Sequence, residues 1–211
     1  MRSSVEYAAI CEQTYRAAWQ SMKKMAANMN DHWAVVLDVD ETVLDNSQYQ
    51  VEIFERGESF SSETWAEWVK REQAKSVPGV KAFLDSVRTL GEYAHIAFIT
   101  NRDAVLEQAT IANMKDLMLW QDGDVILGRR ERSDTKEFRR QEVINGTGRC
   151  QGLGKRKIIA LIGDQIGDLH EEVRGKSVDD LKTSLLKSDH LGVKYFVLPN
   201  PMYGSWERGY R

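Results

Sequence analysis

The sequence predicts an α/β protein: a doubly wound, Rossmann-like parallel sheet with helices on both faces and a small, largely helical cap insertion. Two observations predict this fold. Short, continuous apolar runs rich in Val, Ile and Leu recur along the chain, which is typical of strands buried on both faces of a parallel sheet. Segments with apolar residues at helical spacing lie between these runs, and such alternation favours strand–helix–strand units.

The apolar runs define the expected strands, which are Trp33–Leu37, Ile96–Ile99, Val125–Leu127, Ile158–Ile162 and Tyr195–Leu198. The helical patterns cover Ser4–Asn28, Val80–Leu90, Ala104–Leu119, Thr135–Val143 and Val178–Lys187. Ser4 stands where an N-cap is expected, because a Ser side chain can accept a hydrogen bond from the first helical turn.

Two segments fit the alternation less well. Residues 43–77 separate the first strand from the next helix and hold several aromatic residues. We expect this insertion to be helical around Ser62–Gln73 and to lie over the strand ends as a small cap within a single domain of residues 1–211. The glycine-rich segment 145–154 predicts a mobile surface loop.

The composition limits the possible functions. The chain of 211 residues has a net charge of −3, so no basic field attracts a nucleic acid polymer. No apolar run reaches the roughly 18 residues that a membrane-spanning helix needs. Cys11 and Cys150 belong to no C-x-x-C pair, which argues against a thiolate zinc site. The sequence leaves open whether the two cysteines form a disulfide or stay free.

Acidic residues follow the predicted strands where a parallel sheet collects its functional groups. Asp38 and Asp40 come directly after the first strand, Asp164 follows another, and Asp168 lies shortly beyond it. Thr100 closes a third strand. Because the carboxyl ends of parallel strands meet at one edge, these groups should lie together, and acids so crowded repel unless a cation separates them. Oxygen ligands at an open edge suit Mg²⁺.

This pattern favours phosphoryl chemistry on a phosphomonoester. We expect Asp38 to attack phosphorus as a nucleophile and Asp40 to protonate the leaving group and later activate water. Thr100 and Asn101 can bind the phosphoryl oxygens, and Lys136 can neutralise the remaining charge.

Simpler interpretations stay open for each of these residues. Asp164 and Asp168 could cap a helix, and Thr100 could cap the helix that follows it. Lys136 lies in the basic stretch 129–140, which could be a solvated face.

The motifs resemble those of a known family. V-V-L-D-V-D-E-T-V-L-D-N-S, F-I-T-N-R, Lys136 and G-D-Q-I-G-D resemble the four motifs of the haloacid dehalogenase superfamily of phosphohydrolases. T-W-A-E-W-V, S-V-P-G-V and L-P-N-P-M-Y-G-S-W-E are similar to segments of bacterial class C acid phosphatases, which include outer-membrane lipoprotein nucleotidases. The resemblance runs from about Val5 to Gly209.

The resemblance implies a ligand set and a substrate site. The metal would be bound by the carboxylates of Asp38 and Asp164 and by the main-chain carbonyl of Asp40, with Asp168 supporting it through water. An aromatic pair would grip the base of a nucleoside monophosphate, and Trp65 and Tyr203 match it, although Trp65 could instead pack in the core.

The expected activity is therefore that of a Mg²⁺-dependent acid phosphatase. The alternatives are a phosphotransferase that uses the same nucleophile and a surface binding protein with vestigial activity. The resemblance also implies export to the periplasm or outer membrane if a leader is removed, and otherwise a cytoplasmic protein, with a homodimer as a possible assembly.

Overall fold

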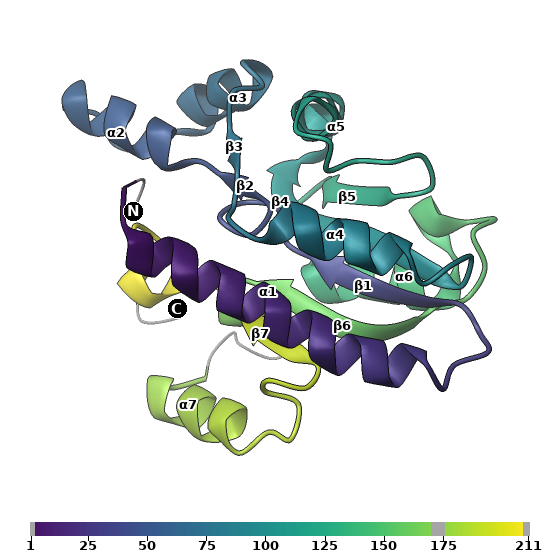
Figure 1. The fold of residues 1–211 in the computed structure, drawn as a ribbon. Helices are drawn as coiled ribbons and strands as arrows, with labels where there is room; N and C mark the ends of the chain where they lie inside the picture. Colours follow the sequence, from purple (N-terminus) through teal and green to yellow (C-terminus); the bar gives the residue numbers. More distant parts are fainter. Residues whose placement is uncertain (1–2, 170–175, 209–211) are drawn as a thin grey trace.

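The computed structural model describes residues 3–169 and 176–208 and contains the expected parallel sheet (Figure 1). Its strand order is β5-β4-β1-β6-β7, and every neighbouring pair is parallel. The strands are β1 (Trp33–Leu37), β4 (Ala94–Asp103), β5 (Val125–Arg129), β6 (Lys157–Gly163) and β7 (Tyr195–Val197). The α/β fold predicted from the apolar runs is confirmed.

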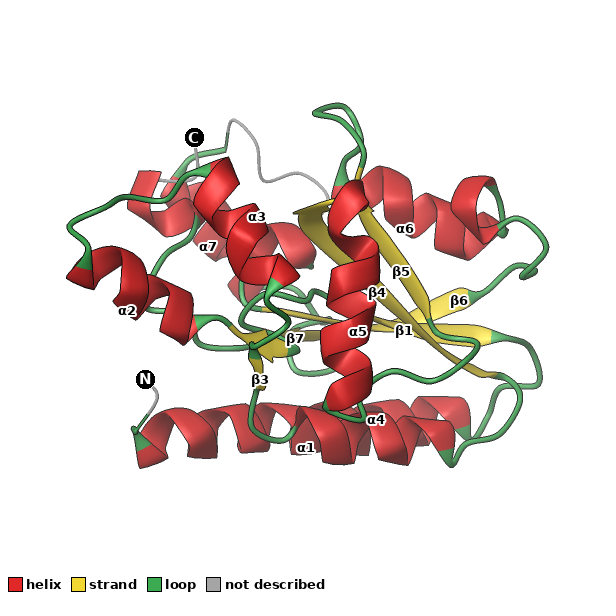
Figure 2. Ribbon diagram, turned by 90° about the horizontal axis from the view of Figure 1, so that it is seen from above, coloured by secondary structure: helices red, strands yellow, loops and turns green. Residues whose placement is uncertain are grey.

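Helices cover both faces of the sheet (Figure 2). Because successive side chains of a strand point to opposite faces, Trp33, Val35 and Leu37 of β1 join one core cluster. That cluster contains buried residues of α1 (Val5–Ala26) and α4 (Val80–Arg88). Ala34 and Val36 join the other cluster, to which α6 (Lys136–Asn145) contributes Val143.

The longest helix, α1, forms as the pattern predicts. Ser4 caps it, since its Oγ accepts a hydrogen bond of 3.1 Å from the backbone N–H of Tyr7. Its buried side chains recur at helical spacing and are Tyr7, Cys11, Tyr15, Ala18 and Met22. The remaining helical segments outside the insertion are η1 (Ala104–Leu106), α5 (Glu107–Asp116), η2 (Gly148–Cys150), η3 (Ile166–Asp168), α7 (Val178–Leu186) and η4 (Ser205–Arg208).

The insertion after β1 contains two helices between two short antiparallel strands. β2 (Leu44–Asp45) pairs with β3 (Lys75–Ser76), and α2 (Ser47–Glu55) and α3 (Ser62–Lys70) lie between them (Figure 1). The helix expected near residue 62 is α3, capped by the Ser61 side chain. The helix α2 was not predicted from the sequence. Its N-cap residue, Asn46, makes no side-chain capping hydrogen bond.

The chain changes direction at β1, and this places the functional edge. It runs from β1 outward to β4 and β5, then returns to β6 and β7 on the other side of β1. In open α/β sheets, ligands bind at the carboxyl ends of the strands where the order switches in this way. The residue after the end of β1 is Asp38.

One predicted strand boundary is wrong. Thr100 does not close its strand, because β4 continues to Asp103, which pairs with Arg129 of β5. The register shifts between Ile99 and Asp103. Such an irregularity re-aims side chains at a sheet edge. Thr100 and the residues after it therefore project from a distorted strand end rather than from a helix start.

The glycine-rich segment 145–154 is more ordered than expected of a surface loop. It contains η2, and Cys150 at the end of η2 is buried among apolar side chains. Cys11 is buried in the cluster on the opposite face of the sheet, and both thiols are free. None of the helices described is long and apolar enough to cross a bilayer.

Candidate functional site

Three acids meet at the switch in strand order. One carboxylate oxygen each from Asp38, Asp164 and Asp168 lies within 4.8 Å of the others. Asp38 directly follows β1, Asp164 follows β6, and Asp168 ends η3. The backbone N–H of Asp38 donates to the carbonyl of Ile162 at 2.9 Å, so the ladder between β1 and β6 extends to the first acid. The predicted gathering of these side chains is what the structure contains.

Backbone contacts hold Asp168 in place. Its Oδ2 accepts a hydrogen bond of 3.0 Å from the backbone N–H of Gln165, which caps η3. Asp168 therefore acts as a capping acid and as a member of the acid cluster at once. Gly163 packs directly against it, since a Cβ at Gly163 would lie 2.3 Å from Asp168 Oδ2. The approach of Asp168 to the site depends on the missing side chain at Gly163.

Lys136 supplies the positive charge within the acid cluster. It is the first residue of α6, whose N-cap is Thr135. Its Nζ donates to Oδ1 of Asp38 and, at 2.6 Å, to Oδ1 of Asp168. The Lys136 side chain is buried, yet the two carboxylates raise its pKa above the ordinary value, so it stays charged. The alternative of a solvated basic face is wrong for this residue.

The acid cluster carries more negative charge than Lys136 compensates. Burial raises the pKa of Asp38 well above its ordinary value, although Lys136 opposes that shift. Burial and the neighbouring Asp168 raise the pKa of Asp164 to about 7. Crowded carboxylates that resist ionisation favour a bound cation, because the cation stabilises their charged forms.

Asp40 points away from the acid cluster and is held by different partners. Its Oδ1 accepts hydrogen bonds from Nε of Arg102 at 2.9 Å and from Nδ2 of Asn46 at 3.0 Å. Its Oδ2 accepts from the hydroxyl of Thr100 at 3.3 Å. Asp40 retains partial solvent exposure, 19% of its side chain. The two aspartates of the D-x-D motif thus occupy separate environments.

Thr100 and Asn101 lie in the irregular end of β4, where Thr100 contacts Asp40. The Thr100 hydroxyl accepts from the backbone N–H of Arg102 and contacts Asp40, so it caps no helix. Asn101 is exposed. Arg139 of α6 fixes this end of β4 with two hydrogen bonds. Its Nη1 donates to the Thr100 carbonyl, and its Nη2 donates to Oδ1 of Asn101 at 2.9 Å.

The sequence analysis assigned no role to several residues that shape the site. Arg139 is fully buried and Arg140 is nearly so, and the Nη1 of Arg140 donates to the Asp168 carbonyl at 3.0 Å. Arg102, although it belongs to the F-I-T-N-R motif, was not recognised as a partner of Asp40. No local pattern marks such contacts, since buried arginines and solvated arginines look alike in a basic stretch.

The two predicted substrate aromatics come from different segments of the chain. Trp65 is half-buried on α3, where its ring packs against Tyr49 with centroids 5.0 Å apart, so it does contribute to packing as the alternative suggested. Tyr203 lies in the C-terminal segment, next to the turn made by Asn200. Asn200 Nδ2 donates to Oδ2 of Asp164 at 2.8 Å and ties that segment to the acid cluster.

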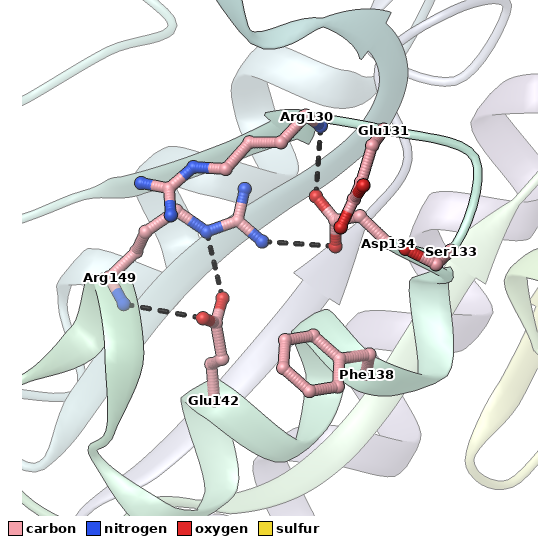
Figure 3. Close-up of a pocket in the computed structure, with 7 residues that line it drawn as sticks. All are labelled: Arg130, Glu131, Ser133, Asp134, Phe138, Glu142 and Arg149. Carbon is pink, nitrogen blue, oxygen red and sulfur yellow. Dashed lines mark hydrogen bonds and ion pairs between the residues drawn. The ribbon is translucent and has the colours of Figure 1, made fainter.

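A pocket of about 340 Å³ is lined by side chains of α6 and of the segments that precede and follow it (Figure 3). None of the predicted site residues lines it. Asp134 lines this pocket and forms an ion pair of 3.2 Å with Arg149. Arg149 also forms an ion pair of 2.8 Å with Glu142. Asp134 also forms an ion pair of 3.4 Å with Arg139, so a residue of the pocket contacts the arginine that binds Thr100 and Asn101.

Comparisons with known proteins agree with this geometry. A family model described as HAD superfamily, subfamily IIIB (Acid phosphatase), matches residues 2–206. The fold is similar to the class C acid phosphatase from Bacillus anthracis, with a TM-score of 0.83 and 29% sequence identity over 99% of this chain and 84% of that chain. A structure of the class C acid phosphatase from Bacillus anthracis with tungstate bound gives a TM-score of 0.82 at 28% identity, over 99% and 85% of the chains.

Proposed function

The chain belongs to the acid phosphatases of HAD subfamily IIIB and is a phosphomonoesterase, and from this premise we propose that it is Mg²⁺-dependent and works through an aspartyl-phosphate on Asp38. The observation that carries the proposal is the approach of Asp38, Asp164 and Asp168 at the carboxyl ends of two neighbouring strands. These three acids come from distant parts of the chain, and the fold brings them together.

The donor set fits a small hard cation. All three acids of the cluster offer oxygen and are buried or partly buried, and among the described residues only Lys136 forms ion pairs with them. The carboxylates of Asp38 and Asp164 and the main-chain carbonyl of Asp40 would hold Mg²⁺, with Asp168 supporting it. When bound, the metal reduces the repulsion between Asp38 and a phosphate dianion and stabilises negative charge on the transferring group.

The residues of the chain then divide the reaction between two steps. In the first step, an oxygen of Asp38 forms a bond to phosphorus, the ester P–O bond breaks, and Asp40 gives its proton to the departing oxygen. In the second step, Asp40 takes a proton from a water molecule whose oxygen attacks phosphorus. The bond to Asp38 breaks, which releases inorganic phosphate and restores the carboxylate.

The phosphoryl oxygens would be bound by Thr100, Asn101 and Lys136. Asn101 can serve this role because its Oδ1 is occupied by Arg139, which leaves its amino group to donate. Lys136 already bridges Asp38 and Asp168, so its ammonium lies beside the atom proposed to attack. Positioned donors and cations of this kind stabilise a transferring phosphoryl group.

We propose nucleoside monophosphates and small aryl phosphates as substrates. Trp65 and Tyr203 would stack on the base or ring, and stacking accepts many different rings. Phe60, whose ring centroid lies 6.2 Å from that of Trp65, is largely exposed and extends the aromatic surface. Trp65→Ala should raise KM for adenosine monophosphate about 10-fold and leave KM for glycerol phosphate, which has no ring, within about 2-fold.

The decisive experiment measures inorganic phosphate released from p-nitrophenyl phosphate and adenosine monophosphate. Release should stop after chelation with EDTA and resume with Mg²⁺. Asp38→Asn should lower kcat by at least about 10³-fold, because the nucleophile is lost. The matched control is Asp31→Asn, which changes an exposed aspartate at the other end of β1 and should keep full activity.

Two results would contradict this proposal. The first is full activity of Asp38→Asn, and the second is an acid-quenched reaction in which no peptide containing Asp38 carries phosphate. Phosphate that appears on an added alcohol instead of in solution would identify a phosphotransferase.

A further inference from the structure

Arg102 is a buried arginine with every side-chain nitrogen engaged. It lies in the irregular end of β4, and only 3% of the residue is exposed. Its Nε and Nη2 both contact Oδ1 of Asp40, at 2.9 and 2.8 Å. Its Nη1 donates to the hydroxyl of Thr110 on α5 at 3.1 Å. A planar guanidinium fixed at several points can hold a carboxylate in one orientation.

These contacts make the two oxygens of Asp40 unequal. Oδ1 accepts from Arg102 and Asn46, so three nitrogen donors surround it. Within residues 3–169 and 176–208, Oδ2 accepts only the 3.3 Å hydrogen bond from the Thr100 hydroxyl, and that hydroxyl can also rotate and accept. Oδ1 is therefore fully occupied, and Oδ2 is the oxygen of Asp40 that has room for a further partner.

Arg102 also contacts the insertion that covers the site. Its guanidinium carbon lies 5.5 Å from the centroid of the Trp65 ring on α3. Its Nη2 donates at 3.2 Å to Oδ1 of Asn46, which also accepts from Nε1 of the buried Trp68 at 2.8 Å. One side chain thus touches both the acid beside the reaction centre and the helix that carries the aromatic surface.

We propose that Arg102 is a positioning residue that orients Oδ2 of Asp40 toward the leaving-group oxygen. Through its contact with Trp65, it also fixes the position of Asp40 relative to the Trp65 ring. The inference rests on the proposed role of Asp40 as the acid. The part of the effect of Arg102 that depends on the leaving group belongs to the first step, in which the ester oxygen departs with a proton. Esters whose leaving groups depart without a proton should not need Arg102.

The test is the dependence of kcat/KM on the leaving group, because kcat/KM reports the first step. The substrates are 2,4-dinitrophenyl phosphate, which has a good leaving group, and phenyl and glycerol phosphates, which have poor ones. Arg102→Ala should lose at least about 100-fold with the poor leaving groups and less than about 5-fold with the dinitrophenyl ester. Millimolar guanidinium chloride should restore part of the activity of Arg102→Ala.

Three comparisons separate positioning from general damage. Arg16→Ala removes an exposed arginine on α1 and should behave as the unaltered enzyme with every substrate. Arg102→Lys keeps the charge without the planar fork and should show the same leaving-group preference to a smaller degree, which provides a measurement if Arg102→Ala does not fold. Arg102→Ala added to Asp40→Asn should cost nothing further.

The outcomes are distinguishable. If Asp40→Asn discriminates between leaving groups but the Arg102 variants lose activity equally with all of them, Arg102 is only structural and the inference is overturned. If Asp40→Asn itself loses activity equally with all substrates, Asp40 is not the acid, and its assignment is overturned together with that of Arg102. Discrimination in both variants supports the inference.

Discussion

The Nη2 of Arg139 donates a hydrogen bond of 2.9 Å to Oδ1 of Asn101. An amide nitrogen cannot accept from a guanidinium, so this contact fixes which way the side chain faces. Among the residues described, the Nδ2 of Asn101 has no acceptor. The amino group is therefore the part that remains for an anionic ligand.

Asn101→Asp should weaken phosphate binding. The substitution keeps an oxygen for Arg139 but replaces the free amino group by a charged oxygen, which repels phosphate. The inhibition constant of inorganic phosphate should rise at least about 10-fold, equivalent to about 1.4 kcal/mol. Asn145→Asp, which adds the same charge at an exposed position at the end of α6, is the control and should leave the inhibition constant unchanged.

Lys136→Met should destabilise the metal-free protein as well as inactivate it. Removal of the ammonium leaves Asp38 and Asp168 buried without their shared partner. The loss of one member of a buried ion pair costs about 3 to 5 kcal/mol. Urea unfolding in EDTA measures it, and exposed Lys155→Met is the control. An unchanged free energy of unfolding would contradict the buried pairing.

The contribution of Asp164 to the stability of the metal-free protein should be lost as the pH rises from about 4 to about 7. Burial and Asp168 raise the pKa of Asp164 from 3.8 to about 7, so the folded protein binds this proton more tightly than the unfolded chain does. The contribution is complete below the unfolded pKa and is lost as the pH rises through the folded pKa. Its upper bound is on the order of 4 kcal/mol.

Thermal unfolding in EDTA across that pH window tests this sign. Asp164→Asn should flatten the slope relative to the unaltered protein, whereas Asp31→Asn should not. Added Mg²⁺ should raise Tm more at pH 7.5 than at pH 5, because protons compete with the metal for the acids. A Tm that rises with pH in EDTA, to the same extent in both proteins, would show that Asp164 does not carry this effect.

Cys11 and Cys150 should not form a disulfide within the folded chain. They are buried in core clusters on opposite faces of the sheet, and burial raises the pKa of Cys11 to about 11. Ellman's reagent should detect almost no thiol in minutes on the native protein and both thiols after denaturation. A reducing agent should not change Tm. A fall of Tm on reduction would contradict the free thiols.

Much of the fold and the acid cluster could be predicted because the relevant signals are local. Each buried strand is a continuous apolar run, and Asp38 and Asp164 directly follow two such runs. Parallel pairing then brings the ends of β1 and β6 together without further information. The helix α6 was predictable as well, and Thr135 at its start accounts for the position of Lys136.

The missed features depend on contacts between distant segments. Arg102 and Asp40 are separated by 62 positions, and Asn200 and Asp164 by 36, so no spacing rule connects them. The extension of β4 past Thr100 requires the partner Arg129 on β5 and the register shift before it. The helix α2 lacks a capping side chain, and its periodic residues alone did not distinguish it from a loop.

Gly163 gives the site a vulnerability that its charged residues do not reveal. A single methyl group there would overlap the carboxylate of Asp168 and displace it, although no ionisable group would be lost. A paralogue with alanine at this position would keep every acid of the constellation and still hold them in the wrong shape. A comparison of catalytic residues alone would therefore count such a paralogue as active. The residue at position 163, beside Asp168, would distinguish it from an active enzyme.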